Sequence, residues 1–298
     1  MLITVALGRS DKTCDHEGKL MRLIKFCKNE HNIKAGCPTI QLGTFQYYRE
    51  LDPSFSIADE DEGTITYHAQ PTAENPLLLT PEQWNSISGG AVQITRQDQP
   101  SPTRWPGPVD FSMSDGGMEF TNEGMINYHG NLRIQHSYPN AYMFCLSAIE
   151  DEADIPDPAT IDPSYDSYYE VEPESLDQFM KILGHLLHQS LTYQDILFDR
   201  LHEPAPLAIP SQEAHVTWVH RNVSYVDSRV RKLRTADEFQ TNALQNLYQN
   251  ALFEKSTDYE GDNEYRIVFF VQHPRLGVLT AKKDAKVLTI NQLVAGIA

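Results

Sequence analysis

The chain has 298 residues, of which 40% are hydrophobic and 10% aromatic, which is enough apolar surface for a globular core. Its formal net charge of −17 excludes a surface that binds nucleic acid everywhere, because a global negative field repels phosphate. The sequence has no apolar run of about 18 residues and therefore predicts no membrane span. Its N-terminus lacks the charged and apolar regions of a signal peptide, and its cysteines form no CxxC pair, so we expect a cytoplasmic protein with reduced thiols.

The first third of the chain is predicted to be mostly β, with two further strands before residue 149, from alternation of apolar and polar residues and from enrichment in β-branched and aromatic types. The expected strands are Leu2–Leu7, Leu20–Phe26, Thr39–Tyr48, Thr64–His68, Gly130–His136 and Ala141–Ala148. One short helix is expected after Thr80, because Thr80 and Gln83 have the spacing of a capping box and Pro81 suits the first helical position.

The second half alternates helices with strands. Ser175 with Gln178 predicts the start of a helix that continues to about His202, and Thr235 with Glu238 predicts the start of another. The strands expected there are His215–Val219, Asn222–Val226, Glu264–Gln272 and Ala285–Ile290. The pattern predicts an α+β fold, with residues 1–298 forming one elaborated domain.

Charge is distributed unevenly along the sequence. Between Glu150 and Glu174 there are ten acidic residues and no Lys or Arg, interleaved with prolines and tyrosines. This composition predicts a solvated acidic loop inserted at 150–174, with docking of a partner as the alternative. Two basic segments are suited to an anionic ligand; they are Lys19, Arg22, Lys25 and Lys28, and Arg221, Arg229, Arg231, Lys232 and Arg234.

The common signatures of metal and phosphate sites are absent from the sequence. His185 and His188 share a predicted helix face, but no third ligand follows at a recognised spacing. The gaps between the cysteines and histidines of residues 14–37 match no zinc module, so we predict no metal. Neither a GxSxG elbow, a P-loop nor a GxGxxG fingerprint occurs.

The strongest candidate site is the stretch from Asp262 to Phe270, which reads as a buried strand from Tyr265 onward. Alternation along a strand places Asp262, Glu264 and Arg266 on one face. Two carboxylates and a guanidinium at the start of an apolar strand are costly to bury. They therefore indicate either an ion pair that seals the sheet or an active site.

A second candidate cluster is Tyr47, Tyr48 and Arg49 at the end of a predicted strand, followed by the acidic turn Asp59–Gly63. The tyrosines would provide a stacking surface for a planar ring, and Arg49 a cation for phosphate. The alternative is an aromatic core strand whose arginine pairs with the acidic turn.

These residue types suit cleavage of the N-glycosidic bond of nicotinamide, because the leaving group needs little acid–base help. Such an enzyme must hold a pyrophosphate, stack the nicotinamide and place a carboxylate beside an oxocarbenium-like centre. Arg22, the Tyr47–Tyr48 pair and Glu264 would serve these three roles, and Asp262 would meet the acceptor nucleophile.

The pieces RLIKF, LGTFQYYRE, ADEDEG, YMFCLS, VSYVD and FEKSTDYEGDNEYRIVF resemble poorly characterised bacterial and phage-defence proteins. The last piece resembles the catalytic-glutamate strand of the ADP-ribosyltransferase superfamily, which includes toxins that modify nucleic acids. The resemblance implies a split mixed or antiparallel β core with flanking helices around an NAD⁺ cleft. It further implies that Glu264 is the catalytic carboxylate, Arg22 the NAD⁺-binding arginine and Ser147 the middle-strand serine, with Arg49 as the substitute for Arg22.

We therefore expect a toxin or anti-phage effector that transfers ADP-ribose from NAD⁺ to a macromolecule. An RNA or DNA acceptor would bind Arg229, Arg231, Lys232 and Arg234. A toxin needs restraint, so the resemblance also implies an antitoxin or chaperone. The alternatives are an NAD⁺ glycohydrolase, in which water is the acceptor, and a non-catalytic defence protein that binds a partner through the acidic loop.

Overall fold

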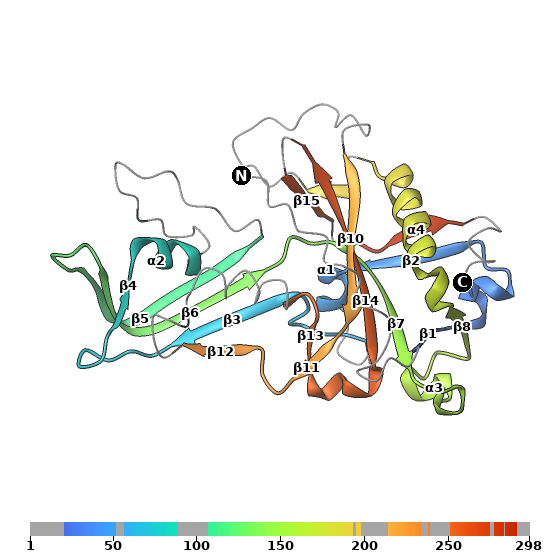
Figure 1. Ribbon diagram of the computed structural model, residues 1–298, viewed down its shortest axis with the longest axis horizontal. Coiled ribbons are helices and arrows are strands. Elements are labelled where there is room, and N and C mark those ends of the chain that lie inside the picture. The colour runs from blue at the N-terminus through green and yellow to red at the C-terminus, as the bar shows by residue number, and fades with distance from the viewer. Residues whose placement is uncertain are drawn as a thin grey trace. The chain divides into compact units, whose positions relative to one another are not determined.

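The computed structural model describes residues 21–51, 57–88, 94, 107–192, 195–197, 214–233, 238, 251–274, 277–282 and 284–290. The chain divides into two compact units, each made of separate stretches of sequence. The small unit contains residues 63–139 and 226–256, and the large unit contains residues 2–62, 140–225 and 257–298. The expectation of one elaborated domain over residues 1–298 stays a prediction beside this division, because hydrophobic periodicity identifies buried positions but not the core that each one joins. Both units consist mostly of strands with few helices, which confirms the α+β class (Figure 1).

The small unit contains a five-stranded sheet. Its strands are β3 (Thr64–Ala69), β4 (Leu77–Leu79), β5 (Val109–Phe120), β6 (Ile126–Ser137) and β12 (Val230–Leu233). Strand β12 is parallel to β3, β3 is antiparallel to β6, and β6 also pairs with β4 and β5. Alternate side chains such as Ile65 and Tyr67 enter the core with Ile134.

Helix α2 (Pro81–Ile87) of the small unit begins where the capping box predicted it. The Gln83 amide donates to Thr80 Oγ1 at 3.1 Å, and the Thr80 amide donates to Gln83 Oε1 at 2.8 Å. Trp84 then packs in the core of the small unit. These two hydrogen bonds confirm the capping box. It could be predicted from the sequence because both partners lie in one short segment and depend on no tertiary contact.

Strand β5 was not predicted. Most of its side chains are exposed, and its register with β6 shifts between Ser114 and Gly117. A strand at the edge of a sheet that faces solvent has no regular apolar alternation, and a bulge interrupts what alternation there is.

The large unit contains a nine-stranded sheet. Its strands are β1 (Arg22–Cys27), β2 (Thr39–Thr44), β7 (Tyr142–Ile149), β8 (Ser167–Val171), β9 (Ile196–Leu197), β10 (His215–Asn222), β14 (Glu264–His273), β15 (Gly277–Ala281) and β16 (Lys286–Thr289). Strand β7 pairs with β14 along one edge, and β1 and β2 share its other edge. The described strand pairs of this sheet are antiparallel.

One face of the large sheet is covered by helix α4 (Leu176–Ser190), through Phe179, Leu183 and Leu187. The prediction continued this helix to about His202, but the helix ends at Ser190, and residues 198–213 are outside the described part. The expected capping box is not formed, because Ser175 already has helical backbone angles after a short 3₁₀ turn and makes no side-chain cap bond.

The segment predicted as a strand over Thr39–Tyr48 changes structure at Thr44. Strand β2 ends there, and helix α1 (Phe45–Arg49) follows. Thr44 is extended, and its hydroxyl accepts a hydrogen bond from the Tyr47 amide at 3.0 Å. The prediction was wrong for residues 45–48, because aromatic residues favoured a strand while Thr44 was an unrecognised N-cap.

The acidic segment 150–174 is more than the inserted loop that its composition suggested. It contains a 3₁₀ turn at Glu152–Asp154, helix α3 (Pro158–Ile161) and strand β8, which pairs with β1. Tyr169 and Val171 of β8 are buried in the main core. Strand β8 was not predicted because the many charged residues of this segment obscured its short alternation of buried and outward-facing side chains.

The remaining described elements are 3₁₀ turns Asn29–His31 and Ile33–Ala35, strands β11 (Ser224–Val226) and β13 (Glu254–Ser256), and 3₁₀ segment η7 (Thr257–Asp262). The strand expected at Leu2–Leu7 and most of the helix expected from Thr235 lie outside the described residues. The described helices include none with the length and apolar character of a membrane span.

Candidate functional site

The face of the large sheet opposite α4 carries polar side chains from four neighbouring strands, β14, β7, β1 and β8. Glu264 of β14 is in register with Ser147 of β7, and Ser147 is in register with Ile24 of β1. Ile24 is in turn paired with Glu170 of β8, so these four residues form one row across the sheet. Cross-strand neighbours point to the same side, and the row therefore lies on a single face.

Strand β14 begins at Glu264, and this changes the position expected for Asp262. Asp262 ends η7, and Asn263 between them has a positive φ of 47°. Strand alternation consequently relates Glu264 to Arg266 but does not extend to Asp262, which is half-buried at the adjoining turn. The Glu264 amide donates to the Tyr225 hydroxyl at 2.8 Å, which fixes the start of the strand.

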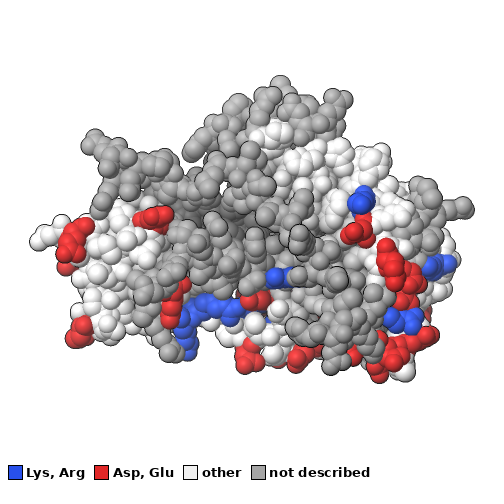
Figure 2. Space-filling view, in the orientation of Figure 1, with Lys and Arg blue, Asp and Glu red and all other residues white. Residues whose placement is uncertain are grey.

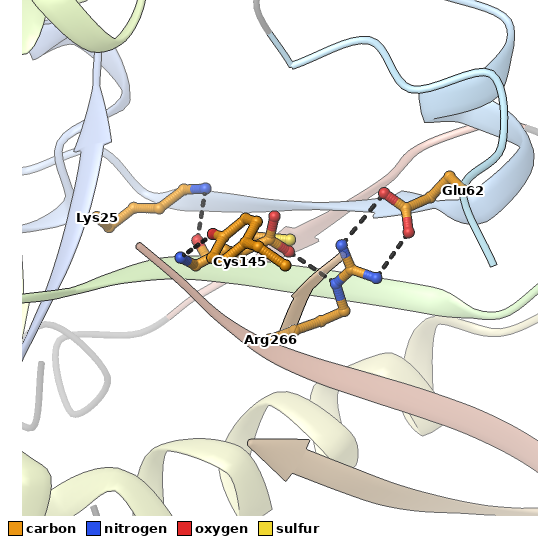
Figure 3. Close-up of polar contacts among 6 residues, drawn as sticks. Lys25, Glu62, Cys145 and Arg266 are labelled. Carbon is orange, nitrogen blue, oxygen red and sulfur yellow. Dashed lines mark hydrogen bonds and ion pairs between the residues drawn. The ribbon is translucent and has the colours of Figure 1, made fainter. Parts of the chain in front are cut away.

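The centre of this face is a buried guanidinium between two carboxylates (Figure 3). Arg266 donates from Nη1 and Nη2 to Glu62 at 2.6 and 3.2 Å, and from Nε to Glu264 Oε1 at 2.7 Å. The Arg266 side chain is 0% exposed. Burial opposes its charge, but the carboxylates of Glu264 and Glu62 outweigh burial and raise the pKa of Arg266 well above its usual value.

Cys145 adds a thiol to this cluster. It is the register partner of Arg266, and its side chain is hydrogen-bonded to Glu264. Burial first, and the Glu264 charge second, raise the pKa of the Cys145 thiol far above its usual value. The thiol therefore remains protonated and donates to the carboxylate, which argues against a nucleophilic role.

Tyr47 and Tyr48 are on helix α1 rather than on a strand. Their rings meet edge to face with centroids 5.3 Å apart. The Tyr48 ring covers Gly43 of β2 so closely that a Cβ at Gly43 would overlap it. Burial, with smaller contributions from Cys145 and Glu264, raises the pKa of Tyr48, so Tyr48 lies within electrostatic range of the candidate carboxylate.

Arg49 follows the tyrosines and has a different environment from Arg266. It is half-buried, and within the described residues it makes no hydrogen bond or ion pair. Burial lowers the pKa of its guanidinium, and Glu62 is the first of several carboxylates that oppose this shift at longer range. A recessed cation that has no direct partner among the described residues is able to bind an anion.

Arg22 is on the same face but belongs to a separate cluster. Its Nε and Nη2 donate to Glu170 at 3.0 and 2.5 Å, and its Nη1 donates to Glu152 at 2.8 Å. Hydrogen bonds to Glu170 and then to Glu152 raise the pKa of Arg22. The structure thus brings Ser147 opposite Glu264 and Tyr48 near it, whereas the guanidinium of Arg22 is already bonded by the acidic segment.

Three residues of this region were not singled out as site residues from the sequence, namely Glu62, Cys145 and Tyr165. Burial raises the pKa of Tyr165 to about 12, and its electrostatic neighbours include Cys145 and Tyr47. Only Glu62 carried a usable signal, since it belongs to the acidic turn after the tyrosines.

The basic segment expected to bind nucleic acid lies in the small unit, and its members differ in exposure. Arg229 is buried, and Arg231 forms an ion pair of 2.5 Å with Glu254. Lys232 is exposed, and Arg234 is outside the described residues. Figure 2 shows a short band of basic side chains over β3 and β12, and acidic side chains gathered over α3 and β8.

His185 and His188, considered as metal ligands, do not form a metal site with other described residues. His188 Nε2 is 2.8 Å from the carbonyl oxygen of Ala214. Across the described part of the chain, no three His, Cys, Asp or Glu side chains are grouped to hold a metal ion. Comparison with known proteins finds no matching family model, curated protein or solved structure.

Proposed function

We propose that the protein is an ADP-ribosyltransferase-like enzyme that transfers ADP-ribose from NAD⁺ to a macromolecule. The observation that carries the proposal is the position of Glu264, which starts β14 opposite Ser147 and has Tyr48 in electrostatic range. An antiparallel sheet that forks at β7, where β1 and β2 share one edge, is compatible with the split β core of that superfamily. As a toxin or anti-phage effector in the cytoplasm, it would need an antitoxin or chaperone partner.

In this proposal the bond between nicotinamide and C1′ of the ribose breaks, and its electron pair leaves with nicotinamide. Positive charge develops on the ribose, and the Glu264 carboxylate stabilises it in a region of low dielectric. Tyr47 and Tyr48 provide the aromatic surface for nicotinamide. A nucleophile of the acceptor then bonds to C1′ and loses its proton to solvent or to Asp262.

The phosphates of NAD⁺ are assigned to Arg49 rather than Arg22. Glu152 and Glu170 already bond the Nε and both Nη atoms of Arg22. Arg49 has no such bond among the described residues and adjoins Tyr48 in the chain. A guanidinium binds phosphate oxygens in pairs, which suits a pyrophosphate.

The acceptor is open between nucleic acid and water. A nucleic acid would use the basic segment of Arg229, Arg231, Lys232 and Arg234. Burial of Arg229 and the Arg231–Glu254 ion pair leave Lys232 as its exposed cation among the described members. This observation favours the second candidate function, NAD⁺ glycohydrolase, in which water attacks C1′.

Incubation with NAD⁺ labelled in its adenylate half, alone and with RNA, DNA or cell protein, tests the proposal. Label on a macromolecule supports transfer, and free labelled ADP-ribose supports the glycohydrolase. A Glu264→Gln variant that unfolds like the wild type should lose this activity and any inhibition of cell growth. Absence of NAD⁺ turnover in every mixture would contradict both enzymatic functions and leave a non-catalytic interaction protein.

A further inference from the structure

Glu62 reaches the candidate site from the acidic turn that precedes the small unit in the chain. Its backbone amide donates to the Asp59 carbonyl at 3.1 Å. The Tyr259 hydroxyl donates to the Ala58 carbonyl at 2.6 Å, so η7 anchors the same turn. The Glu62 side chain is only 3% exposed, which is unusual for a carboxylate outside a strand or helix and requires a bound cation.

That cation is Arg266, and the way in which its N–H groups are divided is informative. Glu62 receives the terminal Nη1 and Nη2 groups, which is the paired geometry of a strong guanidinium–carboxylate contact. Glu264 receives the side-on Nε. Glu62 is therefore the main counter-ion of Arg266, and Glu264 is oriented by the same guanidinium.

Within the group of Arg266, Glu62 and Glu264, the two carboxylates outnumber the guanidinium by one charge, and all three side chains are buried. A second arginine, Arg221 of β10, is the register partner of Arg266 and is therefore on the same face of the sheet. Arg49 is an electrostatic neighbour of Glu62, and the Cys145 thiol that contacts Glu264 is neutral. Because Glu62 shares Arg266 with Glu264, loss of the Glu62 charge would make the surroundings of Glu264 more positive by one charge.

We infer that Glu62 is a positioning residue: as the main counter-ion of Arg266, it holds Glu264 in place and keeps the surroundings of the reacting ribose more negative than Arg266 and Glu264 would without it. This inference rests on the proposed function. Without the Glu62 charge, Arg266 would offset Glu264 and repel the positive charge that develops at C1′. In a low-dielectric site such a change acts on the transition state more than on binding of NAD⁺.

Replacement of Glu62 by glutamine tests this role, with Glu62→Asp as the conservative variant and Glu152→Gln as the matched control. Glu152 also bonds an arginine Nη on this sheet, but at an exposed position. We expect Glu62→Gln to lower kcat for NAD⁺ at least about tenfold with KM changed less than about twofold. Glu62→Asp should recover part of the loss, and Glu152→Gln should behave as the wild type. A folded Glu62→Gln variant with wild-type kcat would overturn the inference.

A second measurement decides the counter-ion assignment without any turnover. The unfolding midpoint is compared for Glu62→Gln in the wild-type background and in an Arg266→Met background. If Glu62 is the counter-ion, the loss caused by Glu62→Gln should disappear or reverse when Arg266 is absent. Equal losses in both backgrounds would refute the pairing. If the wild type does not turn over NAD⁺, the proposed function and the catalytic part of this inference fail together, and the cycle still decides the pairing.

Discussion

The large sheet holds two arginines that each bond two glutamates, in opposite surroundings. Arg266 and Arg22 each use Nε and both Nη atoms on two glutamates, and both lie on the face opposite α4. The Arg266 side chain is 0% exposed, whereas that of Arg22 is 30% exposed. The partners follow the same trend, from 3% for Glu62 to 76% for Glu152.

The comparison shows that ion pairing alone does not distinguish a catalytic site from a structural ion pair. At the exposed edge, solvent screens the Arg22 pairs, and their loss leaves charges that water can hydrate. In the interior, removal of one partner leaves a buried charge without compensation. The buried cluster is therefore the one whose geometry is firmly fixed, and fixed geometry is what a catalytic carboxylate needs.

The largest expected difference between the two clusters is in stability. Arg266→Met should lower the free energy of unfolding by about 3–5 kcal/mol, because Glu62 and Glu264 would remain buried without their cation. Urea denaturation with a global fit measures this loss. If the free energy of unfolding falls by less than about 1 kcal/mol, water reaches the two carboxylates, and the buried cluster does not differ from the exposed cluster of Arg22.

The thiol beside Glu264 provides a chemical measure of the buried cluster. Alkylation proceeds through the thiolate, and burial with the nearby Glu264 charge raises the pKa of Cys145. In the folded protein at pH 8, Cys145 should react at least about 100-fold more slowly than in urea. Peptide mapping after a short exposure to iodoacetamide gives the rate. Equally fast labelling in both states would contradict a protonated, buried thiol.

The smallest expected effect concerns the exposed cluster. Arg22→Met should lower the free energy of unfolding by about 1 kcal/mol or less, since its carboxylate partners become hydrated. The loss should shrink further in 1 M salt, where the Debye length is about 3 Å, while the Arg266 effect should persist. Denaturation at low and high salt checks both statements, and a salt-independent loss at Arg22 would place it with the buried class.

Local signals in the sequence predicted much of the fold, and contacts between distant segments explain what was missed. Alternation identified β3, apolar and aromatic content identified β7 and β14, and the Thr80–Gln83 capping box identified α2. The helix at Phe45–Arg49 and strand β8 were missed, because a single N-cap and a short buried pair were outweighed by composition.

The candidate site was predicted in part for the same reason. Glu264 and Arg266 were assigned to one face from strand period alone, and that assignment is confirmed. The pairing of Arg266 with Glu62 joins residues 204 positions apart, which no local pattern reveals. Asp262 was misplaced because the positive φ of Asn263 interrupts the alternation just before the strand.

The most direct test of the central claim compares one substitution at two places in a single row of the sheet. Glu264→Gln and Glu170→Gln each remove a carboxylate that bonds an arginine on the same face. We predict that Glu264→Gln lowers NAD⁺ turnover at least about 100-fold, whereas Glu170→Gln changes it less than about twofold. Wild-type turnover in a folded Glu264→Gln variant, or an equal loss in both variants, would contradict the assignment of Glu264 as the catalytic carboxylate.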